Sequence, residues 1–199
     1  MAKGRSCFKI VCVGRNYLKH IEELGNRRPS EPVFFLKPCS AVANRLQIPK
    51  GERCDFEGEL SFRIVDGRLG EVGFGLDLTL RDLQRQLKEK GLPWDRAKGF
   101  KGSALFSKFA PISDWRGLEV RTYIDGELRQ RGGVGLMLFK PDQLLKEADR
   151  AFGLEEGDLL MTGTPAGVGR LRVGNRVRGE VWQMGRLLVE REWVVEERG

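Results

Sequence analysis

Residues 57–79 read EGELSFRIVDGRLGEVGFGLDLT, and this stretch decides the fold class. It holds two runs rich in β-forming residues, Gly58–Val65 and Gly73–Thr79, punctuated by glycines, and such runs predict short strands. Lys9–Gly14 (KIVCVG) and Val33–Pro38 (VFFLKP) have the same character. Strands therefore dominate the first half of the chain.

The second half adds two predicted hairpins, and helices are few. Glu119–Gln130 centres on Asp-Gly, the dipeptide that favours a type I′ turn, and Arg176–Val195 has a second candidate turn at Met-Gly. Apolar residues at helical spacing predict three helices, at Asn16–Leu24, Leu80–Lys90 and Pro141–Phe152. We therefore predict one α+β domain, mostly β, over residues 1–199.

Composition excludes several classes of protein. The chain has 199 residues, of which 40% are hydrophobic and 32% charged, so disorder and a collagenous repeat are excluded. No stretch approaches the roughly 20 apolar residues of a membrane span, and the N-terminus lacks an apolar signal core, so we expect a cytoplasmic protein. Cysteines 7, 12, 39 and 54 form no CxxC pair, which excludes a zinc ribbon and favours reduced, buried thiols.

The net charge of +7 is concentrated at one end of the chain. Residues 1–50 hold ten Lys and Arg against three Glu, whereas residues 51–199 hold 25 charges of each sign. A basic segment can indicate nucleic-acid binding, but these charges are scattered singly and no nucleic-acid motif accompanies them. Attraction of small anions fits the pattern at least as well.

Three acidic residues in the opening stretch are candidate metal ligands. Glu57 and Glu59 are two apart on a predicted strand, so both side chains leave the same face, and Asp77 interrupts the apolar run of the next strand. Carboxylates from adjacent strands suit Mg²⁺ or Mn²⁺. The alternative is an exposed Glu-x-Glu face with Asp77 capping the following helix, and the pattern alone leaves both open.

His20 and Glu23 are a candidate catalytic pair. At i, i+3 on a helix they share a face, so the carboxylate could orient the imidazole as a general base for water. The alternative is a surface histidine in a charged helix. His20 is the only histidine in the chain, so no other imidazole could serve.

Thr162–Pro165 (TGTP) leads into a glycine-rich segment that could present backbone N–H groups and hydroxyls to an anion, or could be an ordinary turn. Lys37, Arg81 and Lys98 are single cations beside these segments. Three carboxylates and a divalent ion sum to −1, so an anionic 2-oxo acid would need two or three such cations.

These residues together resemble the fumarylacetoacetate hydrolase family, closest to its short acylpyruvate hydrolase and oxaloacetate decarboxylase members. The resemblance rests on motifs that occur in the family's order: GRNY at 14–17 with His20 and Glu23, FLKP at 35–38, ExEL at 57–60, DLTxRD at 77–82, Lys98, DGE at 125–127, GD at 157–158 and TGTPxGVG at 162–169. It covers the chain from about Val13 onward.

The resemblance implies a mixed β-sheet roll of the family's C-terminal domain type with a few short helices, and a homodimer. It implies Mg²⁺ or Mn²⁺ on Glu57, Glu59 and Asp77, and catalysis by His20, Glu23 and Lys98, with the helix of His20 mobile until substrate binds. It places substrate contacts at five residues: Arg15, Lys37, Arg81, Gln84 and Thr164.

From these residues we expect metal-dependent hydrolysis of a C–C bond in acylpyruvate-type 1,3-dicarbonyl acids, of the acetylpyruvate or fumarylpyruvate class. In that reaction the metal would stabilise an enolate. The same stabilisation would serve an oxaloacetate decarboxylase, or an isomerase or decarboxylase of 2-hydroxyhepta-2,4-diene-1,7-dioate. We expect a small 2-oxo acid as the partner, and neither nucleic acid nor membrane. A basic anion-binding module without turnover is the alternative from another class.

Overall fold

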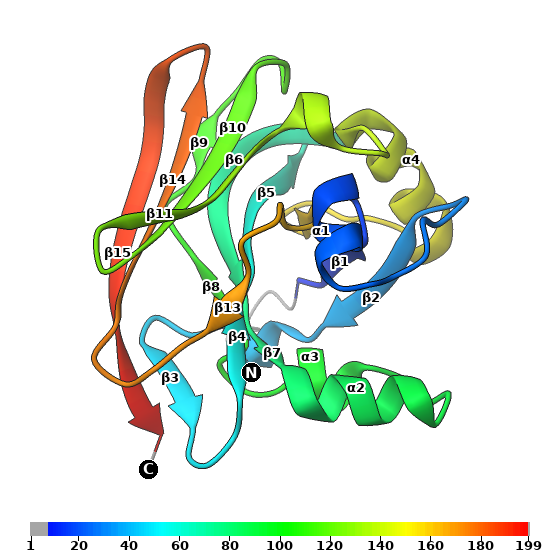
Figure 1. The fold of residues 1–199 in the computed structure, drawn as a ribbon. Coiled ribbons are helices and arrows are strands. Elements are labelled where there is room, and N and C mark those ends of the chain that lie inside the picture. The colour runs from blue at the N-terminus through cyan, green and yellow to red at the C-terminus, as the bar shows by residue number, and fades with distance from the viewer. Residues whose placement is uncertain (1–7, 199) are drawn as a thin grey trace, which may run out of the picture.

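The computed structural model describes residues 8–198 and contains three β-sheets with four short helices around them (Figure 1). The largest sheet has seven strands in the order β2-β1-β12-β5-β6-β8, and β9 also pairs with β6. Its strands are β1 (Ile10–Gly14), β2 (Val33–Lys37), β5 (Gly58–Val65), β6 (Arg68–Asp77), β8 (Ala104–Phe106), β9 (Ala110–Pro111) and β12 (Leu159–Met161). β1 and β12 run parallel, and their neighbours are antiparallel, so the sheet is mixed.

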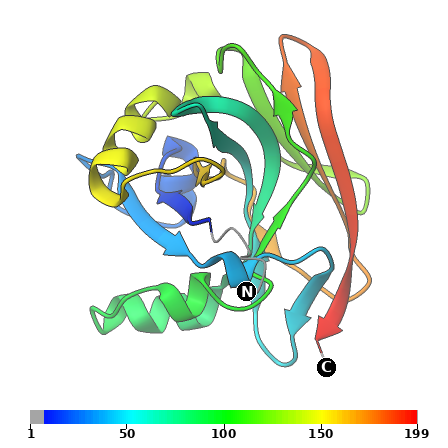
Figure 2. The same cartoon turned by 180° about the vertical axis from the view of Figure 1, so that it is seen from behind.

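A five-stranded sheet faces this one, in the order β11-β10-β14-β15-β3. Its strands are β3 (Leu46–Pro49), β10 (Leu118–Ile124), β11 (Glu127–Gly133), β14 (Arg176–Gln183) and β15 (Arg186–Arg198). The end of β15 lies beside β3, which it pairs with in parallel (Figure 2). A small third sheet has the strand order β13-β4-β7. Its strands are β4 (Cys54–Phe56), which directly precedes β5; β7 (Thr79–Leu80), which directly follows β6; and β13 (Gly169–Arg170).

The main core lies between the two large sheets, where apolar residues of β5, β6, β10 and β14 are fully buried. Phe74 of β6 reaches across to β14, and a Cβ at Gly179 would lie 2.3 Å from its ring. Only glycine allows this approach. The ring of Phe74 also packs against Trp193, with centroids 6.1 Å apart.

The helices flank the seven-stranded sheet. α4 (Pro141–Phe152) begins with proline in its first turn, ends at Gly153 in the left-handed region (φ 59°), and packs Leu144 and Ala148 on β1 and β12. α2 (Arg81–Glu89) and α3 (Asp95–Lys98) lie together below the sheet, and α1 (Leu18–Glu23) lies beside β1 (Figure 1).

Most predicted elements are confirmed, with shifted ends. The Asp125-Gly126 turn has positive φ at both residues, as a type I′ turn requires, and the Met184-Gly185 turn does too. The strand predicted at Gly73–Thr79 begins earlier, at Arg68, and α1 is shorter than the predicted helix. The prediction missed the short helix α3 and seven strands of two to four residues, which are β3, β4, β7, β8, β9, β12 and β13.

Two further predictions concern the membrane and the cysteines. None of the helices in residues 8–198 combines the length and apolar character needed to cross a membrane. Cys12 and Cys54 are buried, as expected, whereas Cys39 is only partly buried. Cys7 and the N-terminal segment examined for a signal core lie outside the described residues.

Candidate active site

Three carboxylates meet where β5 begins and β6 ends. Glu57 directly precedes β5, Glu59 is its second residue, and Asp77 is the last residue of β6. The N–H of Asp77 donates to the carbonyl oxygen of Glu57 over 2.9 Å, which fixes the register of the two strands here. One oxygen from each carboxylate lies within 4.8 Å of the others, and the residues are 5%, 1% and 0% exposed.

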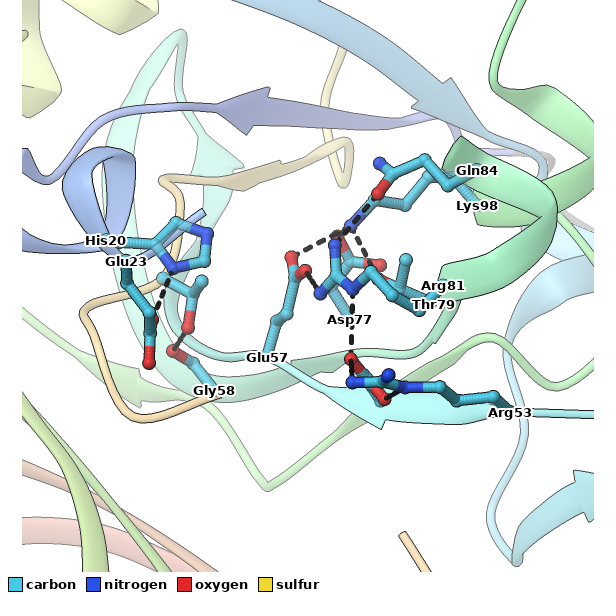
Figure 3. A network of polar contacts seen from close by, with 12 residues as sticks. His20, Glu23, Arg53, Glu57, Gly58, Asp77, Thr79, Arg81, Gln84 and Lys98 are labelled. Atoms are coloured by element: carbon cyan, nitrogen blue, oxygen red, sulfur yellow. Dashed lines mark hydrogen bonds and ion pairs between the residues drawn. The ribbon is translucent and has the colours of Figure 1, made fainter. Parts of the chain in front are cut away.

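Lys98, at the end of α3, is the internal counter-ion of this cluster (Figure 3). Its Nζ donates to Glu57 Oε2 (2.8 Å), Asp77 Oδ2 (2.7 Å) and Thr79 Oγ1 (2.7 Å). Burial alone would lower the pKa of Lys98, but Asp77 and Glu57 outweigh it and raise that pKa above its usual value. Lys98 therefore stays cationic at neutral pH.

Arg81 holds Glu57 from the other side. It is the first residue of α2, donates to Glu57 and to Asp55 Oδ2 (3.0 Å), and also donates to Gln84 Oε1 (2.8 Å). Burial alone would raise the pKa of Glu57, but Lys98 and Arg81 outweigh it and hold that pKa well below its usual value. Glu57 is therefore ionised and doubly paired.

Glu59 has no such counter-ion. Its Oε2 accepts the N–H of Gly163 over 2.8 Å, but across residues 8–198 no lysine or arginine nitrogen lies within ion-pair distance. Burial, Asp77 and Glu57 together raise the pKa of Glu59 well above its usual value. An ionised carboxylate buried beside two others needs a cation. Because all three donors are carboxylate oxygens, the residues fit Mg²⁺ or Mn²⁺.

Lys37 lies behind the carboxylates and not in the pocket. Its Nζ is 2.8 Å from Asp77 Oδ1, and it donates to the carbonyl of Lys98 and to the carbonyl and Oγ of Ser103 (3.2 and 3.1 Å). We expected Lys37 to contact substrate. The structure places its ammonium against Asp77 with the residue 1% exposed, and a substrate contact stays a prediction.

His20 and Glu23 form the expected pair on α1 (Figure 3). His20 Nδ1 lies 3.1 Å from Glu23 Oε2, and Glu23 Oε1 accepts the N–H of Gly167 over 3.0 Å. A carboxylate can only accept here, so Nδ1 donates, and the lone pair of the neutral imidazole is on Nε2. His20 is 6% exposed and close enough to Glu57 to lower its pKa.

The TGTP segment (Thr162–Pro165) forms hydrogen bonds with the strand of the carboxylates and with Gln130. Thr164 Oγ1 donates to the carbonyl of Gly58 (2.9 Å) and accepts from Gln130 Nε2 (2.7 Å), while Gly163 holds Glu59. Asn16 Nδ2 donates to the carbonyl of Thr162 (2.8 Å), which fixes the chain just before α1. The parallel pairing of β1 with β12 brings these distant segments side by side.

One small pocket collects most of the predicted site residues. It is lined by Arg15, His20, Glu57, Arg81, Gln84, Lys98 and Thr164. Its lining also includes three residues that the sequence analysis did not single out, Asn26, Lys88 and Trp94. The only sequence signal for Lys88 was its place on the helix of Arg81, one turn beyond Gln84.

The alternative interpretations of these residues are wrong. Glu57 and Glu59 are buried and do not form an exposed face. Asp77 does not cap α2, whose N-cap is Leu80 with no side-chain hydrogen bond. His20 is buried at the pocket and is not a surface residue.

The model of the fumarylacetoacetate (FAA) hydrolase C-terminal family matches residues 9–190. The chain belongs to the fumarylacetoacetate hydrolase family. Among its relatives in this family, the oxaloacetate tautomerase of Escherichia coli is 38% identical over 189 residues, covering 85% of this chain and 86% of that protein. The mitochondrial oxaloacetate tautomerase of Saccharomyces cerevisiae is 34% identical, covering 96% of this chain and 93% of that protein.

A solved structure shows the same family fold. Fumarylpyruvate hydrolase from Pseudomonas aeruginosa, in complex with Mn²⁺ and pyruvate, matches with a TM-score of 0.83 and 30% identity, covering 100% of this chain and 94% of that one. The predicted family and the predicted mostly β fold are therefore confirmed.

Proposed function

We propose that this protein interconverts the keto and enol forms of oxaloacetate-class 2-oxo acids, with Mg²⁺ or Mn²⁺ held by Glu57, Glu59 and Asp77. The observation that carries the proposal is the pocket itself: a base, His20, and a cation, Lys98, line it together with a carboxylate of the metal-type cluster. The oxaloacetate tautomerases among the relatives support the same substrate class.

The residues divide the reaction between them. When bound, a divalent cation supplies Lewis-acid polarisation of the 2-oxo group. Nε2 of His20 takes a proton from C3, and Glu23 stabilises the imidazolium through Nδ1. Lys98, kept protonated by its carboxylates, stabilises the negative charge that develops on the 2-oxo oxygen. Return of the proton to oxygen gives the enol, and return to C3 gives the ketone.

Decarboxylation of oxaloacetate uses the same stabilised enolate but needs no base, because the C3–C4 bond supplies the electrons. Arg81 and Gln84, hydrogen-bonded to each other, and Thr164 line the pocket and orient the substrate carboxylate in this proposal.

Hydrolysis of acylpyruvates is a second candidate, favoured by the orientation of His20 by Glu23. His20 would take a proton from water, the hydroxide would attack the distal carbonyl, and the C–C bond would break. The enolate of pyruvate that departs would then be protonated at carbon. A fumarylpyruvate hydrolase shares the fold, which supports keeping this candidate.

The experiment is a substrate panel with Mg²⁺, with Mn²⁺ and with EDTA, using oxaloacetate and acetylpyruvate. We expect His20→Ala to slow tautomerisation, and any hydrolysis, by about 10²–10⁴-fold, the usual range for losing a general base. Decarboxylation should fall much less. Glu22→Gln, an exposed change on the same helix, is the matched control. Unchanged tautomerisation in His20→Ala, or turnover that EDTA does not affect, would refute the proposal.

The homodimer and the single catalytic domain over residues 1–199 stay predictions from the family resemblance. Light scattering coupled to size exclusion tests the dimer, which should have twice the 22.5 kDa mass of the chain. Limited proteolysis tests the domain, since one domain should yield no stable internal fragment.

A further inference from the structure

The cations at the pocket fall into two groups. Lys98 and Arg81 are paired with carboxylates. Arg15 and Lys88 also line the pocket, but within residues 8–198 neither has an acidic partner. The Nε of Arg15 is buried and has no hydrogen-bond partner among those residues. Buried donors of this kind are costly unless something accepts from them.

Both unpaired cations lie against one aromatic ring. Arg15 Cζ is 5.9 Å and Lys88 Nζ is 5.0 Å from the centroid of Trp94, which also lines the pocket. Cation–π contacts at these distances orient a cation without neutralising it. Arg15 has a φ of 58°, a conformation unfavourable for a side chain of its size, so the surrounding structure holds it at this position.

The local charge supports an anionic ligand at this point. Around the carboxylates, Asp55, Glu57 and Asp77 are paired with Lys37, Arg53, Arg81 and Lys98. Arg15 and Lys88 are two further cations at the pocket, and within residues 8–198 neither has a carboxylate at ion-pair distance. Burial, followed by Arg15, Arg81 and Lys98, lowers the pKa of Lys88 to about 8, so an anion bound nearby would favour its charged form.

We propose that Arg15 and Lys88 form a second anion subsite beside Trp94, which binds the distal carboxylate of a dicarboxylic 2-oxo acid of four carbons. The inference rests on the proposed function, which places the first carboxylate of the substrate at the cation held by Glu57, Glu59 and Asp77. It assigns Lys88 and Arg15 as determinants of specificity: they favour a substrate with two carboxylates over one that ends in a methyl group.

Stable ligands test the subsite without turnover. Malate and 2-hydroxybutanoate have the same chain length and the same chelating end, and differ only in a terminal carboxylate or methyl group. Calorimetry with the Mg²⁺-loaded protein should show tighter binding of malate. In Lys88→Met we expect malate to bind about 10–100-fold more weakly, the range for losing one charge-assisted hydrogen bond, with 2-hydroxybutanoate within twofold of wild type.

Two control variants exclude general effects. Lys88→Arg keeps the charge and should retain most of the preference for malate. Lys90→Met removes an equal charge from the exposed side of the same end of α2 and should change neither ligand. Because Lys88→Met could perturb folding, its Mg²⁺ affinity and its circular dichroism spectrum are measured first; if either is altered, the comparison is made with Lys88→Gln.

The subsite is refuted if wild type does not distinguish the two ligands, or if Lys88→Met weakens both equally or neither. The proposed function fails separately. If wild type does not turn over oxaloacetate but its preference for malate depends on Lys88, the subsite stands and the reaction is a different one.

Discussion

Replacing Glu59 by Gln should stabilise the metal-free protein and abolish its response to metal. The amide oxygen can still accept the N–H of Gly163, so only the charge is removed. Two unit charges within 4.8 Å of each other repel by at least about 3.5 kcal/mol at an effective dielectric constant of about 20. Lys98 offsets most of the repulsion from Glu57 and Asp77, so we expect a net gain of about 1–2 kcal/mol, or about 2–8 °C in Tm.

The pH dependence of this gain has a definite sign. The pKa of Glu59 is raised, so the folded protein retains a proton that the unfolded chain has lost. The carboxylate therefore destabilises the fold increasingly as pH rises above the ordinary range for a glutamate, and the advantage of Glu59→Gln should grow over the same interval.

The assay is thermal unfolding at neutral pH with EDTA, Mg²⁺ or Mn²⁺. Metal at about 100 times its Kd should stabilise wild type by about 2.7 kcal/mol, or about 5–11 °C, and Glu59→Gln by almost nothing. Glu22→Gln, which makes the same change on the surface of α1, should behave as wild type. A metal-free Glu59→Gln protein that melts below wild type, or one that keeps the full metal shift, would refute the reasoning.

Three other changes test neighbouring parts of the structure. Lys37→Met leaves the buried Asp77 without one of its counter-ions and should cost about 3–5 kcal/mol by urea unfolding; a loss under 1 kcal/mol would show that the pair is not needed. Gly58→Ala places a Cβ 2.0 Å from Thr122 Oγ1, so it should cost about 1–3 kcal/mol, and Thr122→Ala in the same background should restore part of this; no recovery would place the strain elsewhere. The pKa of Lys88 is lowered to about 8 from 10.5, so between these pH values the unfolded chain binds one more proton than the folded protein. The free energy of unfolding of wild type should therefore rise with pH over this interval. An identical rise in Lys88→Met would contradict the lowered pKa of Lys88.

The sequence was informative where local chemistry determines structure. Runs of β-forming residues bounded by glycines, and the Asp125-Gly126 dipeptide, predicted strands and a turn, because both depend on neighbours in sequence. The strands that were missed have two to four residues, too few for a period, and form because partners distant in the chain pair with them.

The same distinction applies to the site. The acidic cluster and the His20–Glu23 pair were predicted from spacing and family motifs, and the structure brings them to one region. The buried position of Lys37 was not predictable, because the sequence of β2 does not show which groups its ammonium will meet in the folded chain. Lys88 and Trp94 were missed because their significance depends on Arg15, which lies more than 70 residues away and meets them only in the folded chain.

The bond between Glu23 and Gly167 makes one backbone amide a natural reporter of motion. That amide is held by a carboxylate on α1, a helix of only six residues. If α1 moves away as the family resemblance predicts, the Gly167 N–H loses its acceptor and can exchange its hydrogen with solvent, even if the rest of the molecule stays closed. We therefore expect hydrogen exchange at this single position to report any opening of the segment that carries His20, and a bound substrate that retains the helix to slow it.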